Sequence, residues 1–301
     1  MITLTRRAPC PKPPLYNTVL SLLTLGEQYL QERGFEKPRD EAEALLLTLL
    51  SLTRIDLYLD SNREVSEKDK QAFLNQIIRR GQHEPLQYIT GQVDFCGLTF
   101  SVSSGVFIPR PETELIVEEV SCIHPQPQAI LDICTGSGVL AISLAKAFPS
   151  ASITAIDCSQ IALETARFNA NRHQTTQIIF LEGDLFSSLN TPLNTQIDCY
   201  DLIVCNPPYI GEDDMHTMDT DVLLHEPKLA LFSPDGGLAH IKRVLTDAPL
   251  FLSPHGILML EIGIGQSGRL IDFIKTNTPF TVRVIQDFSG IDRILICQWT
   301  K

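Results

Sequence analysis

The sequence lacks several features that would assign it to a common class of protein. It has no apolar run of the roughly 18 residues that a membrane-spanning helix needs, so no membrane association is expected. Its eight cysteines include no C-x-x-C pair, and no cysteine and histidine cluster has zinc-binding spacing. The thiols are therefore expected to be reduced, in a cytoplasmic protein. The formal net charge of −12 disfavours a wide nucleic-acid footprint, so no direct nucleic-acid binding is expected.

The sequence also lacks a proton-transfer motif and a phosphate-binding motif. The seven histidines are scattered, with no His–acid or Ser–His arrangement, and each is interpreted as a surface or structural residue. The glycine loop 134–138 (CTGSG) is not a full G-x-G-x-x-G and lacks the Lys-Ser/Thr ending of a P-loop. The loop therefore fits a nucleoside without a diphosphate, and S-adenosyl-L-methionine is the candidate cofactor.

Composition and periodicity divide the 301 residues into four segments. Residues 1–15 form a proline-rich arm that is expected to be flexible. Residues 16–91 have apolar residues at helical spacing and predict a small helical domain, with Asn17 as the candidate N-cap of its first helix. A packed bundle is the plain interpretation of this domain, and docking of the substrate is the functional one. Residues 92–107 predict a β-hairpin linker, and residues 108–301 a larger domain.

Strand and helix patterns alternate through most of the larger domain. Apolar runs of strand length cover 130–133, 153–156, 178–181 and the stretch before Asn206, and helical patterns separate the first three of them. This alternation predicts an α/β fold with a mostly parallel sheet and helices on both faces. The closing strands at 281–286 and 293–299 have no helix between them, so the last strand pair is expected to be antiparallel.

Glycines and acids follow the first three of these strands. Ligands of such folds bind beyond the carboxyl ends of the strands, near the point where the strand order reverses. Gly136 and Gly138 let the backbone approach a ligand closely. Asp157 ends the second strand, where an acid can accept hydrogen bonds from ribose hydroxyls. Asp184 and Leu185 follow the third strand, where a polar and an apolar group together can hold an adenine.

A rigid polar turn, Asn206-Pro207-Pro208-Tyr209, follows the fourth strand. The Asn206 side chain and the Pro207 carbonyl can both accept hydrogen bonds from a flat NH₂-bearing group, and Tyr209 can cover its face. Proline fixes φ and removes a donor, so the carbonyl-rich edge is preset. The plain alternative is a structural turn, because Asn-Pro and Pro-Pro are common turn dipeptides.

These motifs together resemble a known family. Residues 132–138 resemble the first motif of class I methyltransferases, and residues 206–209 resemble the motif of enzymes that methylate adenine, guanine or glutamine nitrogens. Three more blocks, Glu84–Gly91, Ile108–Glu114 and Leu260–Gly263 with Gln266, make the chain similar to the bacterial release factor glutamine methyltransferases of the PrmC/HemK family. The fold expected is then a Rossmann-like class I methyltransferase domain with a small N-terminal helical domain.

The resemblance implies a reaction and a set of roles. The reaction is methylation of the glutamine amide in the Gly-Gly-Gln motif of class-one peptide chain release factors, with S-adenosyl-L-homocysteine as product. The methionine part of the cofactor would lie against the glycine loop, and its ribose would bind Asp157. Asp184 and Leu185 would flank its adenine. Asn206, Pro207, Pro208 and Tyr209 would hold the substrate, with Asn206, Pro207 and Tyr209 catalytic and Asn206 also beside the cofactor. The glycine-loop residues are Cys134, Thr135, Gly136, Ser137 and Gly138.

The chain departs from this family at three places, one of which is the proline-rich arm, an apparent addition. Cys134 stands where the family usually has glycine, and residues 233–238 (SPDGGL) vary from the family's glycine-rich pattern. Two alternatives remain on sequence grounds. An amino-group methyltransferase acting on DNA adenine or ribosomal RNA guanine would use the same Asn-Pro-Pro-Tyr turn, but it needs a basic groove to bind the nucleic acid. A non-enzymatic binding module could use the same fold.

Overall fold

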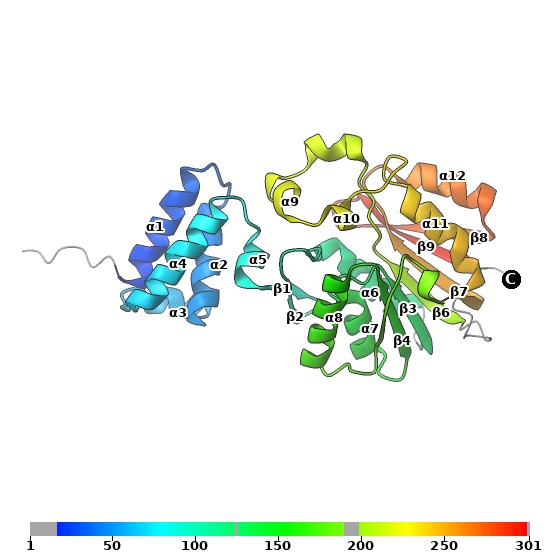
Figure 1. Cartoon of the computed structure of the whole chain (residues 1–301), viewed down its shortest axis with the longest axis horizontal. Coiled ribbons are helices and arrows are strands. Elements are labelled where there is room, and N and C mark those ends of the chain that lie inside the picture. Colours follow the sequence, from blue (N-terminus) through cyan, green and yellow to red (C-terminus); the bar gives the residue numbers. More distant parts are fainter. Residues whose placement is uncertain (1–16, 124–125, 190–198, 300–301) are drawn as a thin grey trace, which may run out of the picture. The chain divides into compact units, whose positions relative to one another are not determined.

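The computed structural model describes residues 17–123, 126–189 and 199–299 (Figure 1). The proline-rich arm expected over residues 1–15 lies outside these ranges. The chain forms two compact units, one up to Thr90 and one from Gly91, and each is described by itself. Among the described residues, none of the helices combines the length and the apolarity that crossing a bilayer requires.

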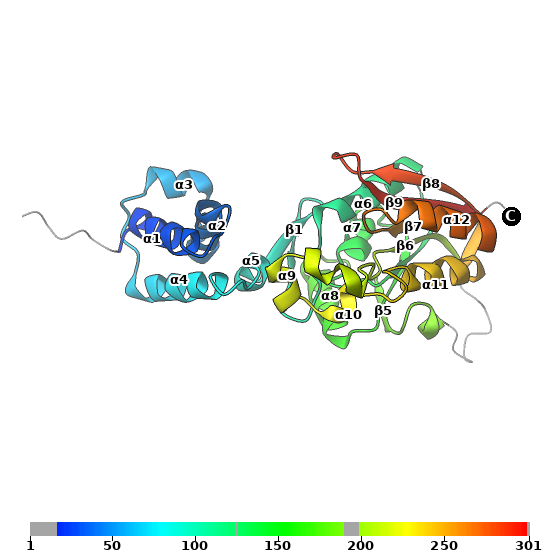
Figure 2. The same ribbon diagram turned by 90° about the horizontal axis from the view of Figure 1, so that it is seen from above.

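The first unit is a bundle of helices. Helices α1, α2 and α4 pack against one another around a shared apolar core that includes Leu22, Leu46 and Phe73 (Figures 1 and 2). Thr18, not Asn17, is the N-cap of α1, because Thr18 and Ser21 satisfy each other's backbone donors in a capping box. The helices are α1 Val19–Gln31, α2 Pro38–Leu50, α3 Arg54–Leu59, α4 Glu67–Arg80 and α5 Leu86–Thr90.

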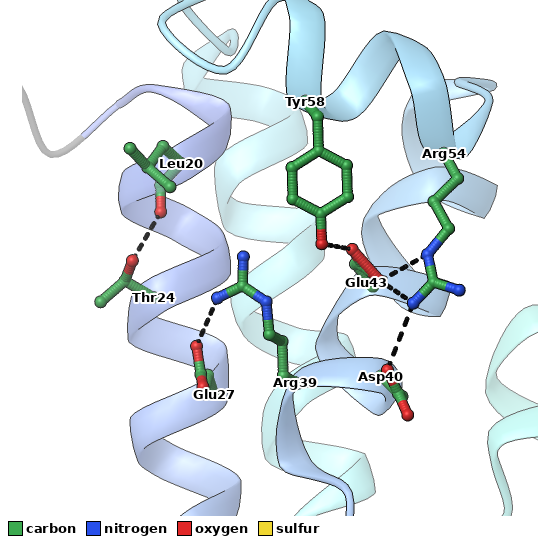
Figure 3. A network of polar contacts seen from close by, with 8 residues as sticks. All are labelled: Leu20, Thr24, Glu27, Arg39, Asp40, Glu43, Arg54 and Tyr58. Carbon is green, nitrogen blue, oxygen red and sulfur yellow. Dashed lines mark hydrogen bonds and ion pairs between the residues drawn. The ribbon is translucent and has the colours of Figure 1, made fainter.

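A buried acid fixes the short helix α3 (Figure 3). Glu43 of α2 has only 2% of its surface exposed and accepts two hydrogen bonds from Arg54, at 3.1 and 2.8 Å. The hydroxyl of Tyr58 also donates to Glu43. A six-residue helix is unstable alone, and a buried carboxylate is costly without partners. Helix α3 and the buried Glu43 carboxylate therefore stabilise each other.

The second unit is a seven-stranded sheet with the strand order β5-β4-β3-β6-β7-β9-β8. The five strands from β5 to β7 are parallel, and β9 pairs antiparallel with both β7 and β8. This confirms the mostly parallel α/β sheet and its antiparallel last pair. The strands are β3 Ala129–Ile133, β4 Ser152–Asp157, β5 Ile179–Glu182, β6 Tyr200–Cys205, β7 Leu252–Glu261, β8 Phe280–Gln286 and β9 Asp292–Trp299.

Side chains alternate between the two faces of the sheet and pack under helices on each. Leu202 and Val204 of β6 join the core under α6, α7 and α8, which also includes Phe95 and Phe100 of a β-hairpin. Ile203 and Cys205 join the core under α11 and α12 (Figure 1). The hairpin strands are β1 Gln92–Phe95 and β2 Leu98–Ser101, and the helices are α6 Glu114–Ile123, α7 Val139–Ala147, α8 Gln160–Arg172, α11 Ala239–Asp247 and α12 Ser267–Asn277.

Short helical segments complete the second unit. A long connection between β6 and α11 contains three of them and reaches the carboxyl ends of the parallel strands. The segments are η1 Pro111–Thr113, η2 Ser187–Leu189, η3 Glu212–Thr217, α9 Thr220–His225, α10 Lys228–Leu231 and η4 Ala248–Leu250.

Candidate active site

A cavity of about 340 Å³ lies at the carboxyl ends of the parallel strands. The strand order reverses between β3 and β6, which is where such sheets bind ligands. All but one of the residues predicted for the site line this cavity. They are Cys134, Thr135, Gly136, Ser137, Asp157, Asp184, Leu185, Asn206, Pro207, Pro208 and Tyr209. The exception is Gly138, which lies behind the loop, where a Cβ would come within 3.1 Å of Ala166 and Ile142.

The turn after β3 is held by a buried acid. Asp132 Oδ2 accepts hydrogen bonds from the Thr135 hydroxyl at 2.6 Å and from the Ala141 backbone at 3.0 Å. Burial raises the pKa of Asp132 to about 7. Cys134 has a φ of +60°, in the left-handed region that favours glycine. A glycine would adopt this conformation without strain, whereas Cys134 adopts it at a cost.

The glycine loop combines an open backbone with buried polar atoms. A Cβ at Gly136 would meet no atom within 4 Å, so this backbone faces open space in the cavity wall. The Ser137 hydroxyl and Asp132 Oδ1 are buried, and neither has a hydrogen-bond partner among the described residues. Buried polar atoms of this kind normally find a partner. The loop therefore offers polar groups to a polar ligand.

Asp157 connects the end of β4 to the glycine loop. Its Oδ2 accepts from the Gly136 backbone and its Oδ1 from the Ser159 backbone, both at 2.8 Å. Burial raises the pKa of the Asp157 carboxyl, and these backbone donors oppose the increase. A carboxylate has about four lone pairs, so Asp157 retains acceptor capacity beyond these backbone bonds. Asp157 can thus accept from a vicinal diol while it positions the loop.

We expect Asp157→Ala to weaken S-adenosyl-L-methionine binding by about 1–3 kcal/mol, the scale for hydrogen bonds to a charged group. Titration calorimetry measures the effect. Asp201→Ala is the matched control, because Asp201 also accepts two backbone hydrogen bonds, at 2.8 and 3.1 Å, but does not line the cavity. Unchanged affinity in a folded Asp157 variant would contradict the assignment.

Further residues that line the cavity follow β5 or lie in α11. Leu185 is buried with a φ of +53°, and Asp184 accepts a hydrogen bond from Arg243 at 2.7 Å. His240 also lines the cavity, with its Nδ1 2.8 Å from the Ser233 hydroxyl. Burial and nearby Arg243 lower the pKa of His240, which favours a neutral imidazole. The sequence predicts His240 to be a surface or structural residue, because no local pattern indicates that it lies beside the glycine loop.

The Asn-Pro-Pro-Tyr turn is fixed at both ends. Asn206 Nδ2 donates to the Thr113 hydroxyl at 3.1 Å, and the Tyr209 hydroxyl donates to Glu261 at 3.0 Å. Gln266 Nε2 donates to the Tyr209 carbonyl at 2.7 Å. Asn206 Oδ1 accepts no hydrogen bond from any described residue. The turn therefore presents free acceptor capacity at the cavity.

Two further segments line the opening of the cavity. Arg110, from the Ile108–Glu114 block, forms an ion pair with Glu226, whose side chain is 1% exposed. Glu226 also accepts from the Ile108 backbone at 3.2 Å. Residues 211–226 contain no lysine or arginine. Asp219 of this stretch lines the cavity, and three more exposed acids precede the lining residues Thr217 and Met218. These four acids, Glu212, Asp213, Asp214 and Asp219, are called the acidic rim.

Fold and site together define a class of protein. A parallel sheet with this reversal, a glycine loop after its first parallel strand and Asn-Pro-Pro-Tyr after the fourth characterise class I methyltransferases that act on amino groups. The catalytic domain of hMettl16, solved with an RNA hairpin, shares this fold with a TM-score of 0.52 at 14% identity, over 78% of this chain and 82% of that chain.

Comparison of the sequences identifies the family. Residues 21–91 match the PrmC N-terminal domain, and residues 98–260 match the methyltransferase small domain. The release factor glutamine methyltransferase of Geobacter sulfurreducens is 38% identical over 94% of this chain and 97% of its own length. The one of Nitratidesulfovibrio vulgaris is 36% identical over 96% and 97%.

The chain therefore belongs to the release factor glutamine methyltransferase family, and it is an S-adenosyl-L-methionine-dependent enzyme. The family, the enzyme class and the cofactor that the sequence motifs indicated are thereby confirmed.

Proposed function

We propose that this enzyme methylates the side-chain amide nitrogen of the glutamine in the Gly-Gly-Gln motif of class-one release factors. The observation that carries the proposal is the free acceptor of Asn206 at the cavity that also contains the glycine loop. An acceptor there fits an NH₂ group and repels a carboxylate. The release factors and this enzyme would meet in the cytoplasm, where translation takes place.

The turn would act mainly by orientation and electrostatics. An amide nitrogen is a weak nucleophile, because its lone pair is delocalised into the carbonyl. Asn206 Oδ1 and the Pro207 carbonyl would accept from its two N–H groups, orient the nitrogen and stabilise the positive charge that develops on it. The bound cofactor supplies a methyl group that its sulfonium already activates. A strong general base is not needed before transfer, because the proton can leave afterwards.

The cofactor roles follow the order of the strands. Cys134, Thr135, Gly136 and Ser137 would line the methionine part, with Gly138 supporting the loop from behind. Asp157 would bind the ribose hydroxyls, and Asp184 with Leu185 would flank the adenine. Each assignment rests on the position of the residue after its strand.

The acidic rim favours a protein over a nucleic acid as substrate. Asp219 lines the cavity, and Glu212, Asp213 and Asp214 are exposed in the segment just before it. These acids would repel phosphates and attract a basic protein surface. Nucleic-acid methylation needs basic side chains at this place to neutralise the backbone. The alternative of a DNA adenine or ribosomal RNA guanine substrate is therefore less favoured.

Transfer of a labelled methyl group tests the proposal directly. The enzyme is incubated with labelled cofactor and, in parallel, with purified release factors, DNA and ribosomal RNA. We expect label on the release factors alone, and none on a release factor whose Gly-Gly-Gln glutamine is replaced by glutamate. Label on DNA or RNA, or on the substituted release factor, would overturn the proposal.

The helical unit is proposed to dock the release factor, because its α3 exposes apolar side chains. Ile55 is 70% exposed, Tyr58 50% and Leu59 83%, and Glu43 holds the helix in place through the Tyr58 hydroxyl and Arg54. Exposed apolar groups on a rigid element are typical of docking surfaces.

We therefore expect a truncated chain that begins at Gln92 to methylate whole release factor poorly while it binds cofactor normally. A short peptide that contains Gly-Gly-Gln is the matched substrate, because it needs no docking surface and both chains should modify it at equal rates. Measuring kcat/KM for both substrates checks this. An undiminished rate of the truncated chain on whole release factor would assign the helical unit another role.

A further inference from the structure

A buried hydroxyl connects Asn206 to a buried carboxylate. Thr113 is 1% exposed and lies in η1, and its Oγ1 is 2.6 Å from Glu261 Oε2 and 3.1 Å from Asn206 Nδ2. Glu261 is 2% exposed and ends β7. Parallel pairing of Cys205 with Leu260 makes Asn206 and Glu261 neighbours at the ends of β6 and β7. The sheet register thus places all three groups together.

Counting protons gives this chain of hydrogen bonds a direction. An ionised carboxylate only accepts, so Glu261 takes the single hydroxyl proton of Thr113. The Thr113 oxygen then has only lone pairs left, and it must accept from its other neighbour. Of the two ends of the Asn206 amide, only the NH₂ group can donate to it. The carbonyl oxygen of Asn206 is therefore turned away from Thr113 and remains available at the cavity.

We propose that Thr113 and Glu261 are positioning residues that hold the Asn206 amide with Oδ1 toward the substrate. This inference rests on the proposed role of Asn206 in binding the substrate amide. Without the hydroxyl, the amide could rotate by half a turn and present its NH₂ group. In that orientation the NH₂ group of Asn206 would face the NH₂ group of the substrate amide, and both can only donate. The substrate nitrogen would then lose one of its two acceptors.

Glu261 serves both ends of the turn. Its Oε1 accepts from the Tyr209 hydroxyl at 3.0 Å while its Oε2 accepts from Thr113. Burial raises the pKa of the Glu261 carboxyl, whereas the hydrogen bonds from Thr113 and Tyr209 and the charge of Arg293 oppose that rise and favour the ionised form. The buried Glu261 carboxylate at the end of β7 thus positions both the acceptor of Asn206, through Thr113, and the ring of Tyr209.

Substitution of Thr113 by valine tests the proposal, because valine has the same shape without the hydroxyl. We expect Thr113→Val to lower kcat roughly tenfold to a hundredfold, the scale for a misplaced reacting group, with cofactor affinity nearly unchanged. Thr113→Ser restores the hydroxyl and should recover most of kcat. Thr175→Val is the matched control, because Thr175 is 2% exposed, donates to the Ala170 carbonyl and lies outside the cavity.

Three results would overturn the proposal: kcat of Thr113→Val within twofold of wild type, equal losses in Thr113→Ser and Thr113→Val, or the same loss in Thr175→Val. If the valine variant does not fold, Thr113→Ala takes its place in the same comparison with serine.

A double-mutant cycle separates positioning from general damage. If Thr113 acts through Asn206, Thr113→Val should cause little further loss of kcat in an Asn206→Ala background. An undiminished second loss would overturn the proposal. Failure of the proposed function looks different, because the wild-type enzyme itself would then leave release factors unlabelled. The cycle would in that case be measured on whichever amino-group substrate becomes labelled.

Discussion

Replacing Asn206 with alanine should lower kcat for release factor methylation about a hundredfold to a thousandfold, the usual cost of losing one preorganised hydrogen-bonding group at a transition state. The variant removes one of the two acceptors for the substrate amide. It leaves the glycine loop and Asp157 in place, so cofactor affinity should remain largely intact. Turnover, cofactor affinity and melting temperature are measured on the same sample.

The structural alternative for Asn206 makes the opposite prediction. If Asn206 only shapes a turn, alanine should lower the melting temperature and change the rate of the folded fraction little. Asn206→Asp refines the test, because it retains an acceptor of similar shape but loses the NH₂ group that donates to Thr113. We expect it to be impaired, although less severely than alanine. A stable alanine variant with near-normal turnover would exclude Asn206 from the active site.

The sequence predicts the centre of the sheet well because β3 and β6 are buried on both faces. Residues 130–133 are apolar except for Asp132, and a helical pattern separates them from the next strand, which is typical of parallel strands. The short helix α3 is not predicted, because six residues show no clear period and its stability depends on Glu43, eleven residues before Arg54. The predicted N-cap of α1 was wrong by one residue, because the capping box between Thr18 and Ser21 determines where the helix begins.

Site residues that lie at or just after the end of a strand are predictable from the sequence. Site residues that depend on contacts between segments far apart in the sequence are not. Asp157 and Asn206 each end or follow a strand, and the fold rule brings their positions together. Thr113 lies 93 residues before Asn206 and 148 before Glu261, and no local pattern indicates that they meet. His240 and Glu226 were missed for the same reason.

The glycine-rich stretch before α11 has a structural role at the turn. Gly237 packs against Tyr209, and a Cβ at Gly237 would lie 2.0 Å from the Tyr209 carbonyl oxygen and 2.7 Å from Gln266 Nε2. No Cβ can remain at the first of these distances, so one backbone must move. Tyr209 is held there by Gln266 and Glu261. The stretch therefore limits how far the Asn-Pro-Pro-Tyr turn can extend toward α11.

We therefore expect Gly237→Ala to lower kcat on the order of a hundredfold, because a shift of about 1 Å in a positioning segment has that effect. The free energy of unfolding should also fall by about 3 kcal/mol or more, since overpacking and a disallowed φ add together. Activity on release factor and urea denaturation measure the two effects. The φ of Gly237 is +85°, so part of the stability loss is conformational strain rather than collision.

Gly236→Ala separates strain from collision. Gly236 has a φ of +58°, so its alanine variant should also lose about 1–2 kcal/mol from left-handed strain. Its Cβ, however, would meet only the end of the flexible Arg269 side chain, at 3.4 Å. The Tyr209 backbone is then undisturbed, and kcat should stay near that of wild type. If both variants lost activity equally, strain in the glycine stretch would be the cause, and contact between Gly237 and Tyr209 would not set the position of the turn.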